Sequence, residues 1–183
     1  MRVLPDDPLR AYAAAAAEGD NVAVAELVRR TERAVWQLCA VLGSDGEIED
    51  LVQETYLRAL RALPRFRGEA PVRLWLLSIA RRTCADHVRR RQRQRRLVDR
   101  LTAEAACHGA AAAADAGDVS ATVDLLQRLD RDRREAFALT QLGGLSYEEA
   151  ATIVGCPIGT IRSRVARARD DLRAATGARA RAG

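Results

Sequence analysis

Apolar residues recur every three or four positions through most of the chain, which is the spacing of one face of an α-helix. In the first half this period covers 9–18, 21–42, 47–63 and 72–96. Glycine, aspartate and asparagine at 19–21 end the first stretch, and a turn with two glycines at 43–46 ends the second. The pattern therefore predicts four helices in this half.

The second half repeats the helical period after a segment of different character. Residues 98–119 are rich in alanine and show no sustained period, which is typical of a linker. Helices are then expected at 120–129 and from the capping residue Asp130 to the glycine pair at 143–144. The two ends of the chain, 1–8 and 176–183, are expected to be loose tails.

The stretch from Ser146 to Arg169 combines several local signals. Ser146 and Glu149 have the spacing of a capping box, in which each side chain satisfies a free backbone N–H group at a helix start. Gly155 can adopt the left-handed conformation that ends a helix, and Pro157 suits the first turn of the next one. The second helix would bury one stripe, made of Ile161, Val165, Ala168 and Leu172. Its arginines lie off that stripe, so we predict a helix-turn-helix that binds the DNA major groove; a merely solvated arginine surface is the alternative.

The composition fits helical domains with cores of their own. Hydrophobic residues make up 48% of the 183 residues, whereas aromatic residues reach only 4%. Alanine and leucine favour helices over sheets. We therefore predict an all-α fold with two small helical domains, at 9–97 and 120–175, joined by a flexible linker at 98–119.

The charge changes sign along the chain in step with this division. All 30 basic residues are arginine, and the formal net charge is +5. Residues 1–97 carry +5 and residues 120–183 carry +3, whereas the linker carries −3. This order indicates two modules that face an anionic partner, joined by a tether with a different role.

The predicted helix at 47–63 has an unusual outer face. Its inner stripe consists of Ile48, Leu51, Val52, Tyr56, Ala59 and Leu63. The opposite face carries Asp50, Gln53, Glu54, Leu57, Arg58 and Arg61. A lone exposed leucine is ordinary, but a leucine set among carboxylates and an amide can centre a protein-binding patch. The residues alone leave both interpretations of Leu57 open.

A short basic loop at 64–71 leads into a helix whose second half is strongly basic. Between Arg81 and Arg96 there are eight arginines and one acid, Asp86. Such a run binds phosphates through counterion release. The aromatic rings of Phe66 and Trp75 could stack on unpaired bases. A core position is the favoured interpretation for Trp75, and for Phe66 neither interpretation is favoured.

The four cysteines are widely spaced and form no C-x-x-C pair. Cys84 and His87, with help from Cys107-His108, could share a metal, but zinc sites need a second ligand pair with matching spacing. Buried or incidental cysteines are therefore the favoured interpretation, and we expect no metal and no cofactor. No nucleophile–base pair or phosphate-binding glycine loop supports an enzyme. Without a signal peptide or an apolar run of about 18 residues, we expect a cytoplasmic protein that does not insert into a membrane.

Two long stretches together resemble one protein family. They are EDLVQETYLRALRALPRFRGEAPVRLWLLSIARRTCADHVRRR and LDRDRREAFALTQLGGLSYEEAATIVGCPIGTIRSRVARARDDL. In this order and separation they resemble the extracytoplasmic-function (ECF, group IV) sigma factors of bacterial RNA polymerase, within the sigma-70 family, and look closest to the sigma-C-like subgroup. The resemblance covers about residues 10–97 and 120–175. It implies sigma region 2 in the first domain, sigma region 4 in the second, and a linker like region 3.2 that threads toward the polymerase active-site channel.

The resemblance assigns roles to three sets of residues. The set expected to dock on the clamp helices of core polymerase is Asp50, Gln53, Glu54, Leu57, Arg58 and Arg61. The set expected to bind the minus-ten element, where a flipped base of the non-template strand is captured, is Arg65, Phe66, Arg67, Gly68, Trp75, Arg81, Arg82, Asp86, Arg89 and Arg90. The set expected to contact the minus-thirty-five element is Thr160, Arg162, Ser163, Arg164 and Arg167.

The implied partners are core RNA polymerase, through its beta and beta-prime subunits, and promoter DNA in duplex and melted form, with the chain a monomer in the holoenzyme. Anti-sigma factors commonly cover both domains in this family, and no residue here identifies one. The family features that are expected to be missing are region 1.1 and a long region 3. One position departs from the pattern: Arg82 stands where many members have asparagine in W-L-x-x-I-A-R-N. A charged fork replaces a neutral amide, which puts the minus-ten sequence preference in doubt but not strand binding.

Two other functions explain part of the pattern. A stand-alone dimeric helix-turn-helix regulator accounts for 120–175 but leaves 47–96 without a role, and no dimerisation helix is evident. A nuclease or recombinase would need clustered carboxylates or a Ser/Tyr nucleophile beside arginines, and none is convincing. We therefore expect a sigma factor that binds core polymerase, directs it to promoters and assists melting, while polymerase supplies the chemistry.

Overall fold

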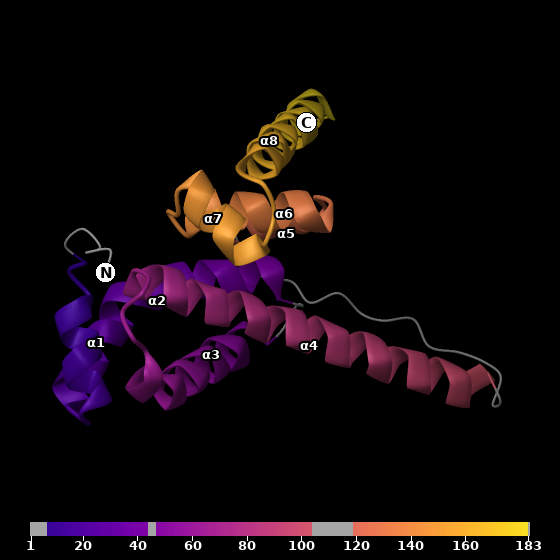
Figure 1. The fold of residues 1–183 in the computed structure, drawn as a ribbon. Coiled ribbons are helices and arrows are strands. Elements are labelled where there is room, and N and C mark those ends of the chain that lie inside the picture. The colour runs from indigo at the N-terminus through magenta and orange to yellow at the C-terminus, as the bar shows by residue number, and fades with distance from the viewer. Residues whose placement is uncertain (1–6, 44–46, 104–118, 183) are drawn as a thin grey trace.

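The computed structural model describes residues 7–43, 47–103 and 119–182 (Figure 1). This part of the chain consists of helices and contains no strand, which confirms the predicted all-α class. Among these residues, no helix has both the length and the hydropathy of a membrane span.

Four helices make up the first half. They are α1 (Arg10–Ala17), α2 (Asn21–Leu42), α3 (Ile48–Ala62) and α4 (Val72–Ala103), and a 3₁₀ turn, η1 (Leu63–Arg65), follows α3. Asp20 starts α2, because its carboxylate accepts hydrogen bonds from the backbone N–H groups of Val22 and Ala23 at 2.8 and 3.2 Å. The four predicted stretches are thus helical, and α4 continues beyond its predicted end at residue 96 to Ala103.

Helix α2 lies against both α3 and α4, and this contact forms the core of the first half. Val35 and Leu38 of α2 and Leu76 and Leu77 of α4 are buried there. Helix α1 packs on the start of α2 around a second, smaller cluster that includes Leu27.

Asp7 belongs to the folded part, although a loose tail is predicted for 1–8. Its carboxylate accepts a hydrogen bond from the backbone N–H of Leu9 at 3.1 Å and another from that of Val72 at 2.7 Å. One side chain therefore satisfies free N–H groups at the starts of α1 and α4. Residues 1–6 of the predicted tail lie outside the described residues.

The second half contains α5 (Val119–Gln127), α6 (Arg131–Phe137), α7 (Tyr147–Val154) and α8 (Ile158–Ala182). Asp130 caps α6 as predicted, with its carboxylate accepting from the N–H of Asp132 at 3.0 Å. The helix expected up to the glycine pair continues from α6 into a π-helical turn, η2 (Ala138–Leu142). The predicted tail from residue 176 is the last part of α8, since its alanines and arginines favour a helix.

The helix-turn-helix signals are confirmed in detail. The capping box forms: the Ser146 hydroxyl accepts from the N–H of Glu149, and the Glu149 carboxylate accepts from the N–H of Ser146. Gly155 ends α7 in the left-handed region, with φ of 75°. The predicted stripe of α8 faces inward, because Ile161, Val165 and Ala168 are buried.

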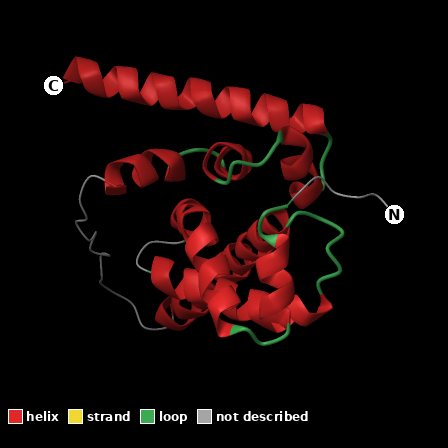
Figure 2. Cartoon of the chain, turned by 90° about the vertical axis from the view of Figure 1, so that its left-hand side faces the viewer, coloured by secondary structure: helices red, strands yellow, loops and turns green. Residues whose placement is uncertain are grey.

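The two halves pack against each other, which the sequence pattern does not indicate. Leu126 and Leu139 of the second half belong to the same buried cluster as Leu38 and Leu77 of the first. Helices α5 to α7 lie against α2 and the first part of α4, while α8 runs along the outside (Figures 1 and 2). The linker residues 104–118 lie outside the described residues.

Two polar contacts fix this packing at its edges. The Arg73 guanidinium donates from Nε to the backbone carbonyl of Gly143 at 2.9 Å, and the Gln127 amide donates to that of Ala40 at 3.3 Å. The backbone of Gly143 comes so near that an added Cβ would lie 3.2 Å from Cδ1 of Leu77. The contact between the halves is therefore close-packed.

Candidate functional site

The outer face of α3 is open along its length. Asp50, Gln53, Leu57 and Arg61 are exposed, and the Leu57 side chain stands among polar groups with 42% exposure. The inner stripe packs inward as predicted, with Leu51, Ala59 and Leu63 buried. Thr55 is also fully buried, which its polar side chain does not suggest, because its hydroxyl donates to the backbone carbonyl of Leu51 at 2.7 Å.

Two members of this face, Glu54 and Arg58, are half-buried where α3 meets α4. The Arg58 guanidinium forms ion pairs with Glu54 at 2.7 Å and with Asp86 of α4 at 2.9 Å. Asp86 also pairs with Arg89 at 2.5 Å. Hydrogen bonds from Arg89 and Arg58 lower the pKa of Asp86. Asp86, expected to face the separated strand, is thus an acceptor that joins α3 to the basic part of α4.

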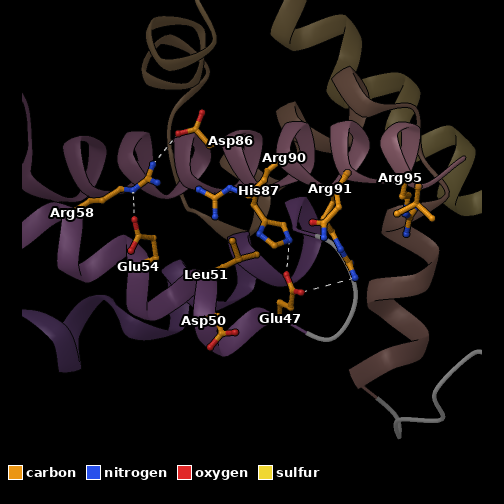
Figure 3. Close-up of a pocket in the computed structure, with 12 residues that line it drawn as sticks. Glu47, Asp50, Leu51, Glu54, Arg58, Asp86, His87, Arg90, Arg91 and Arg95 are labelled. Carbon is orange, nitrogen blue, oxygen red and sulfur yellow. Dashed lines mark hydrogen bonds and ion pairs between the residues drawn. The ribbon is translucent and has the colours of Figure 1, made fainter. Parts of the chain in front are cut away.

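A groove of about 900 Å³ runs beside this link, between the start of α3 and the second half of α4. Most of its acidic residues come from α3 and the residue before it, and most of its arginines come from α4, although Asp86 lies on α4 and Arg58 on α3 (Figure 3). The lining acids are Glu47, Asp50, Glu54 and Asp86, and the lining arginines are Arg58, Arg90, Arg91 and Arg95. The groove therefore offers opposite charges to a partner that lies along it.

His87 lies within this groove. Its Nε2 is 2.6 Å from Oε2 of Glu47, close enough for an ion pair when the imidazole is protonated, although the N–H direction does not satisfy hydrogen-bond geometry. Arg91 approaches the other oxygen of Glu47 at 4.0 Å. Cys84, one turn earlier, is buried against Cys39 in the core. Cys84 and His87 therefore face different surroundings and do not form the metal pair considered from their spacing.

The loop before α4 presents two exposed arginines, Arg65 and Arg67. Between them the Phe66 ring packs on Trp75, with centroids 4.7 Å apart and a tilt of 33°. Both rings are half-buried against the hydrophobic clusters, which agrees with the core interpretation of Trp75. Gly68 turns the loop with φ of +68°, and its Cβ position lies 2.8 Å from the Arg10 guanidinium of α1. A larger residue there would meet both backbone strain and this side chain.

The arginines of α4 are divided between solvent and the second half of the chain. Arg82, Arg89 and Arg90 are exposed, so they remain open to a phosphate backbone. Arg81 points to the second half, where its guanidinium pairs with Glu135 of α6 at 2.6 Å. Arg81, which is expected to contact melted DNA, therefore forms an ion pair with an acidic side chain of α6.

The start of α8 presents most of the expected minus-thirty-five set. Arg162, Ser163 and Arg167 are exposed, and Thr160 is half-buried. Arg164 differs, because its side chain is only 23% exposed and pairs with Asp132 of α6. A second arginine bridge, between Arg133 of α6 and Asp171 of α8 at 2.6 Å, fixes the same two helices.

Sequence reasoning missed these acidic partners of Arg81 and Arg164. Glu135 and Asp132 lie 54 and 32 positions from the arginines that they bind. Periodicity assigns a residue to a face of its own helix, but it does not tell which distant helix covers that face. The sequence offered one signal for these pairs, because α6 carries acidic residues whereas α4 and α8 are strongly basic.

Family models match both halves of the chain. The model described as Sigma-70 region 2 matches residues 27–94, and the one described as Sigma-70, region 4 matches residues 121–172. The ECF RNA polymerase sigma factor SigC of Mycobacterium tuberculosis is 43% identical over 167 residues, which cover 91% of this chain and 90% of that protein. The ECF RNA polymerase sigma-E factor of Escherichia coli K12 is 35% identical, covering 85% and 87%.

Solved structures agree in fold. CnrH, in complex with the cytosolic domain of CnrY, superposes with a TM-score of 0.69 at 30% identity, covering 94% of this chain and 99% of that one. The sigma factor RpoE of Bartonella quintana, in complex with the anti-sigma factor NepR, gives a TM-score of 0.64 at 32% identity, covering 81% and 92%.

Proposed function

Because the chain belongs to the ECF sigma factors of bacterial RNA polymerase, we propose that it docks on core polymerase through the outer face of α3. The observation that supports this docking face is the exposure of Leu57. Its side chain is 42% exposed between Gln53 and Arg61, while the opposite side of α3 is packed into the core. An exposed apolar side chain with a polar rim is the usual anatomy of a protein interface. The groove beside α3 continues this surface toward α4.

Minus-ten DNA is bound by the loop before α4 and by the exposed side of α4. Arg65, Arg67, Arg82, Arg89 and Arg90 are open to solvent and supply phosphate contacts. The packed pair of Phe66 and Trp75 gives this surface a rigid apolar base. Extruding a base from its stack costs a few kcal/mol, which contacts in a pocket offset.

Minus-thirty-five DNA is bound in the major groove by the start of α8. Arg162, Ser163 and Arg167 form its exposed surface. Arginine forks match the acceptors of guanine, and a serine hydroxyl pairs with several bases. Arg164 is not part of this exposed surface, because its guanidinium pairs with Asp132 of α6.

The two halves correspond to region 2 and region 4, with 98–119 as the linker between them. The chain contributes binding and strand separation, and polymerase, in the cytoplasm, supplies the chemistry. An anti-sigma factor is a further partner of this proposal, supported by the complex of RpoE with NepR.

Run-off transcription with core polymerase tests the proposal. Addition of the full chain should make core polymerase start at defined positions on promoter DNA selected from a random pool. A stand-alone regulator would bind duplex DNA as a dimer in a mobility-shift assay and would never direct core polymerase to a start site. That second outcome would overturn the sigma-factor function.

A further inference from the structure

A cavity of about 330 Å³ lies where α4 of the first half meets α6 of the second. Three arginines line it, Arg81, Arg131 and Arg134, together with Gln92 and one acid, Glu135. Leu42, Ala85 and Val88 give it an apolar side. Its volume lies within the range of roughly 300–1,000 Å³ of small-molecule sites, which occur preferentially at domain interfaces.

The charges around this cavity are not balanced. Glu135 is engaged by Arg81 at 2.6 Å. Across 7–43, 47–103 and 119–182, no carboxylate forms an ion pair with Arg131 or Arg134. Two guanidinium groups one helical turn apart on α6 therefore line the cavity without an ion-pair partner among the described residues.

Arg134 shows the imbalance most clearly. Its Nη2 donates to the backbone carbonyl of Leu129 at 3.2 Å, but its Nε is buried and has no acceptor among the described residues. Burial lowers the pKa of Arg134; the nearby carboxylate of Asp130 raises it, and the neighbouring charge of Arg131 lowers it. A buried charged donor without a partner is unfavourable, so an anion in this cavity would relieve a real deficit.

We propose that the cavity binds a small phosphorylated organic molecule, with its phosphate held by Arg131 and Arg134 and its organic part against Leu42 and Val88. Guanidinium forks match phosphate oxygens in pairs, whereas a carboxylate engages fewer donors. The apolar side leaves room for a group larger than phosphate alone. The sigma-factor function does not require this site.

A molecule bound here contacts both halves of the chain. Leu42 and Val88 belong to the first half, and Arg131 and Arg134 belong to the second. A ligand that prefers the packed arrangement shifts the equilibrium toward it by the difference between its binding free energies to the packed and separated arrangements. The site therefore couples a small phosphorylated molecule to the packing of region 4 on region 2.

Isothermal titration of the full chain at fixed ionic strength tests the site. The probes are adenosine 5′-monophosphate, adenosine, inorganic phosphate and acetate. We expect the nucleotide to bind more tightly than inorganic phosphate, and adenosine and acetate to bind at least about tenfold more weakly than the nucleotide, since each lost charged contact is worth about a factor of ten or more.

Two variants and one control localise the binding. Arg134→Gln and Arg131→Gln should each weaken nucleotide binding by about tenfold or more. Arg131 is exposed, so its variant keeps the fold even where Arg134→Gln does not. Arg173→Gln is the matched control, because Arg173 is an exposed arginine of α8 that pairs only with Asp170 in the described residues.

Equal binding by both variants and by wild type would overturn the site, as would equal weakening in Arg173→Gln. Inorganic phosphate binding as tightly as the nucleotide would overturn the organic part of the assignment, and acetate binding as tightly would overturn the phosphate. Run-off transcription without the nucleotide is a separate measurement, so failure of the sigma function and failure of this site are distinguishable.

Discussion

Leu57 is the residue on which the proposed docking to polymerase depends most directly. It is 42% exposed on α3, so replacing it should not disturb the core. Leu57→Asp puts a charge at the centre of the proposed interface, and loss of such an anchor typically costs about 2 kcal/mol or more, about 30-fold or more in affinity. Competition for labelled core polymerase measures this loss. Val22→Asp is the control, because Val22 is 78% exposed on α2, away from this face. Equal binding by the two variants would contradict the docking face.

Variants of Arg162 and Arg164 distinguish a residue that contacts DNA from one that stabilises the fold. Arg162 is exposed, whereas the Arg164 side chain is 23% exposed and paired with Asp132. We expect Arg162→Ala to weaken binding to selected promoter duplex by about 1–3 kcal/mol and to leave unfolding unchanged. Arg164→Ala should lower the free energy of unfolding by less than about 1 kcal/mol, because its partner is solvent-exposed, and should affect DNA less. Anisotropy titrations and urea unfolding of the full-length variants measure the two effects. The reverse order would place Arg164 on the DNA.

The turn between α7 and α8 depends on backbone conformation rather than on space. Gly155 has φ of +75° and an added Cβ there meets nothing within 4 Å. Gly155→Ala should therefore destabilise the protein by about 1–2 kcal/mol through the left-handed conformation alone. Gly159 lies inside α8, also with nothing within 4 Å of an added Cβ, so Gly159→Ala should stabilise by up to about 1 kcal/mol. Urea unfolding distinguishes the signs, and a loss of stability in both variants would refute this account of the turn.

Helices α3 and α4 are joined by an ion pair whose contribution depends on pH. Arg89 and Arg58 lower the pKa of Asp86 from its usual value of 3.8. A carboxyl with a lowered folded-state pKa contributes stability above its unfolded pKa, and that contribution disappears as the pH falls through the folded value. Asp86→Asn should thus cost less than about 1 kcal/mol at neutral pH, because the pair is partly exposed, and nothing at strongly acidic pH. Urea unfolding from pH 7 down to pH 2 measures the difference, and a gap that widens on acidification would show that the sign is wrong.

At the scale of the whole molecule, the packed halves are too close for promoter binding at both elements. Minus-ten and minus-thirty-five DNA lie about 25 base pairs apart, about 85 Å along a duplex at 3.4 Å per pair. Helix α6 touches α4 through Arg81 and Glu135, so the proposed function requires region 4 to leave region 2 when both elements are bound. In the proposed function, the same step frees Arg81 from Glu135 for the melted strand.

Charge reversal tests this packing. Glu135→Arg places two guanidinium groups in contact and should raise the radius of gyration measured by small-angle X-ray scattering, because the halves separate. The double variant Arg81→Glu with Glu135→Arg restores the pair and should restore the compact value. A radius of gyration that is equal in wild type and Glu135→Arg would show that this pair does not hold the halves together.

The sequence by itself determined most of the helical segments and their buried stripes, because helical period and capping are local. It did not indicate that α4 continues to Ala103 or that α8 continues beyond residue 176. The capping box of Ser146 and the buried stripe through Ile161 and Val165 follow from residues a few positions apart. The family resemblance selected the surfaces that are proposed to bind polymerase and DNA. The exposure of Leu57 was also predictable, since it lies opposite an apolar stripe.

The tertiary structure alone decided the partners of charged side chains. Asp86 pairs with Arg58, Glu135 pairs with Arg81, and Asp7 caps α4 from 65 positions earlier in the chain. These contacts join residues far apart in sequence, and their geometry depends on how helices cross, which no single helix specifies. For the same reason the cavity between α4 and α6 exists only in the packed molecule: its arginines are visible in the sequence, but their common enclosure is not.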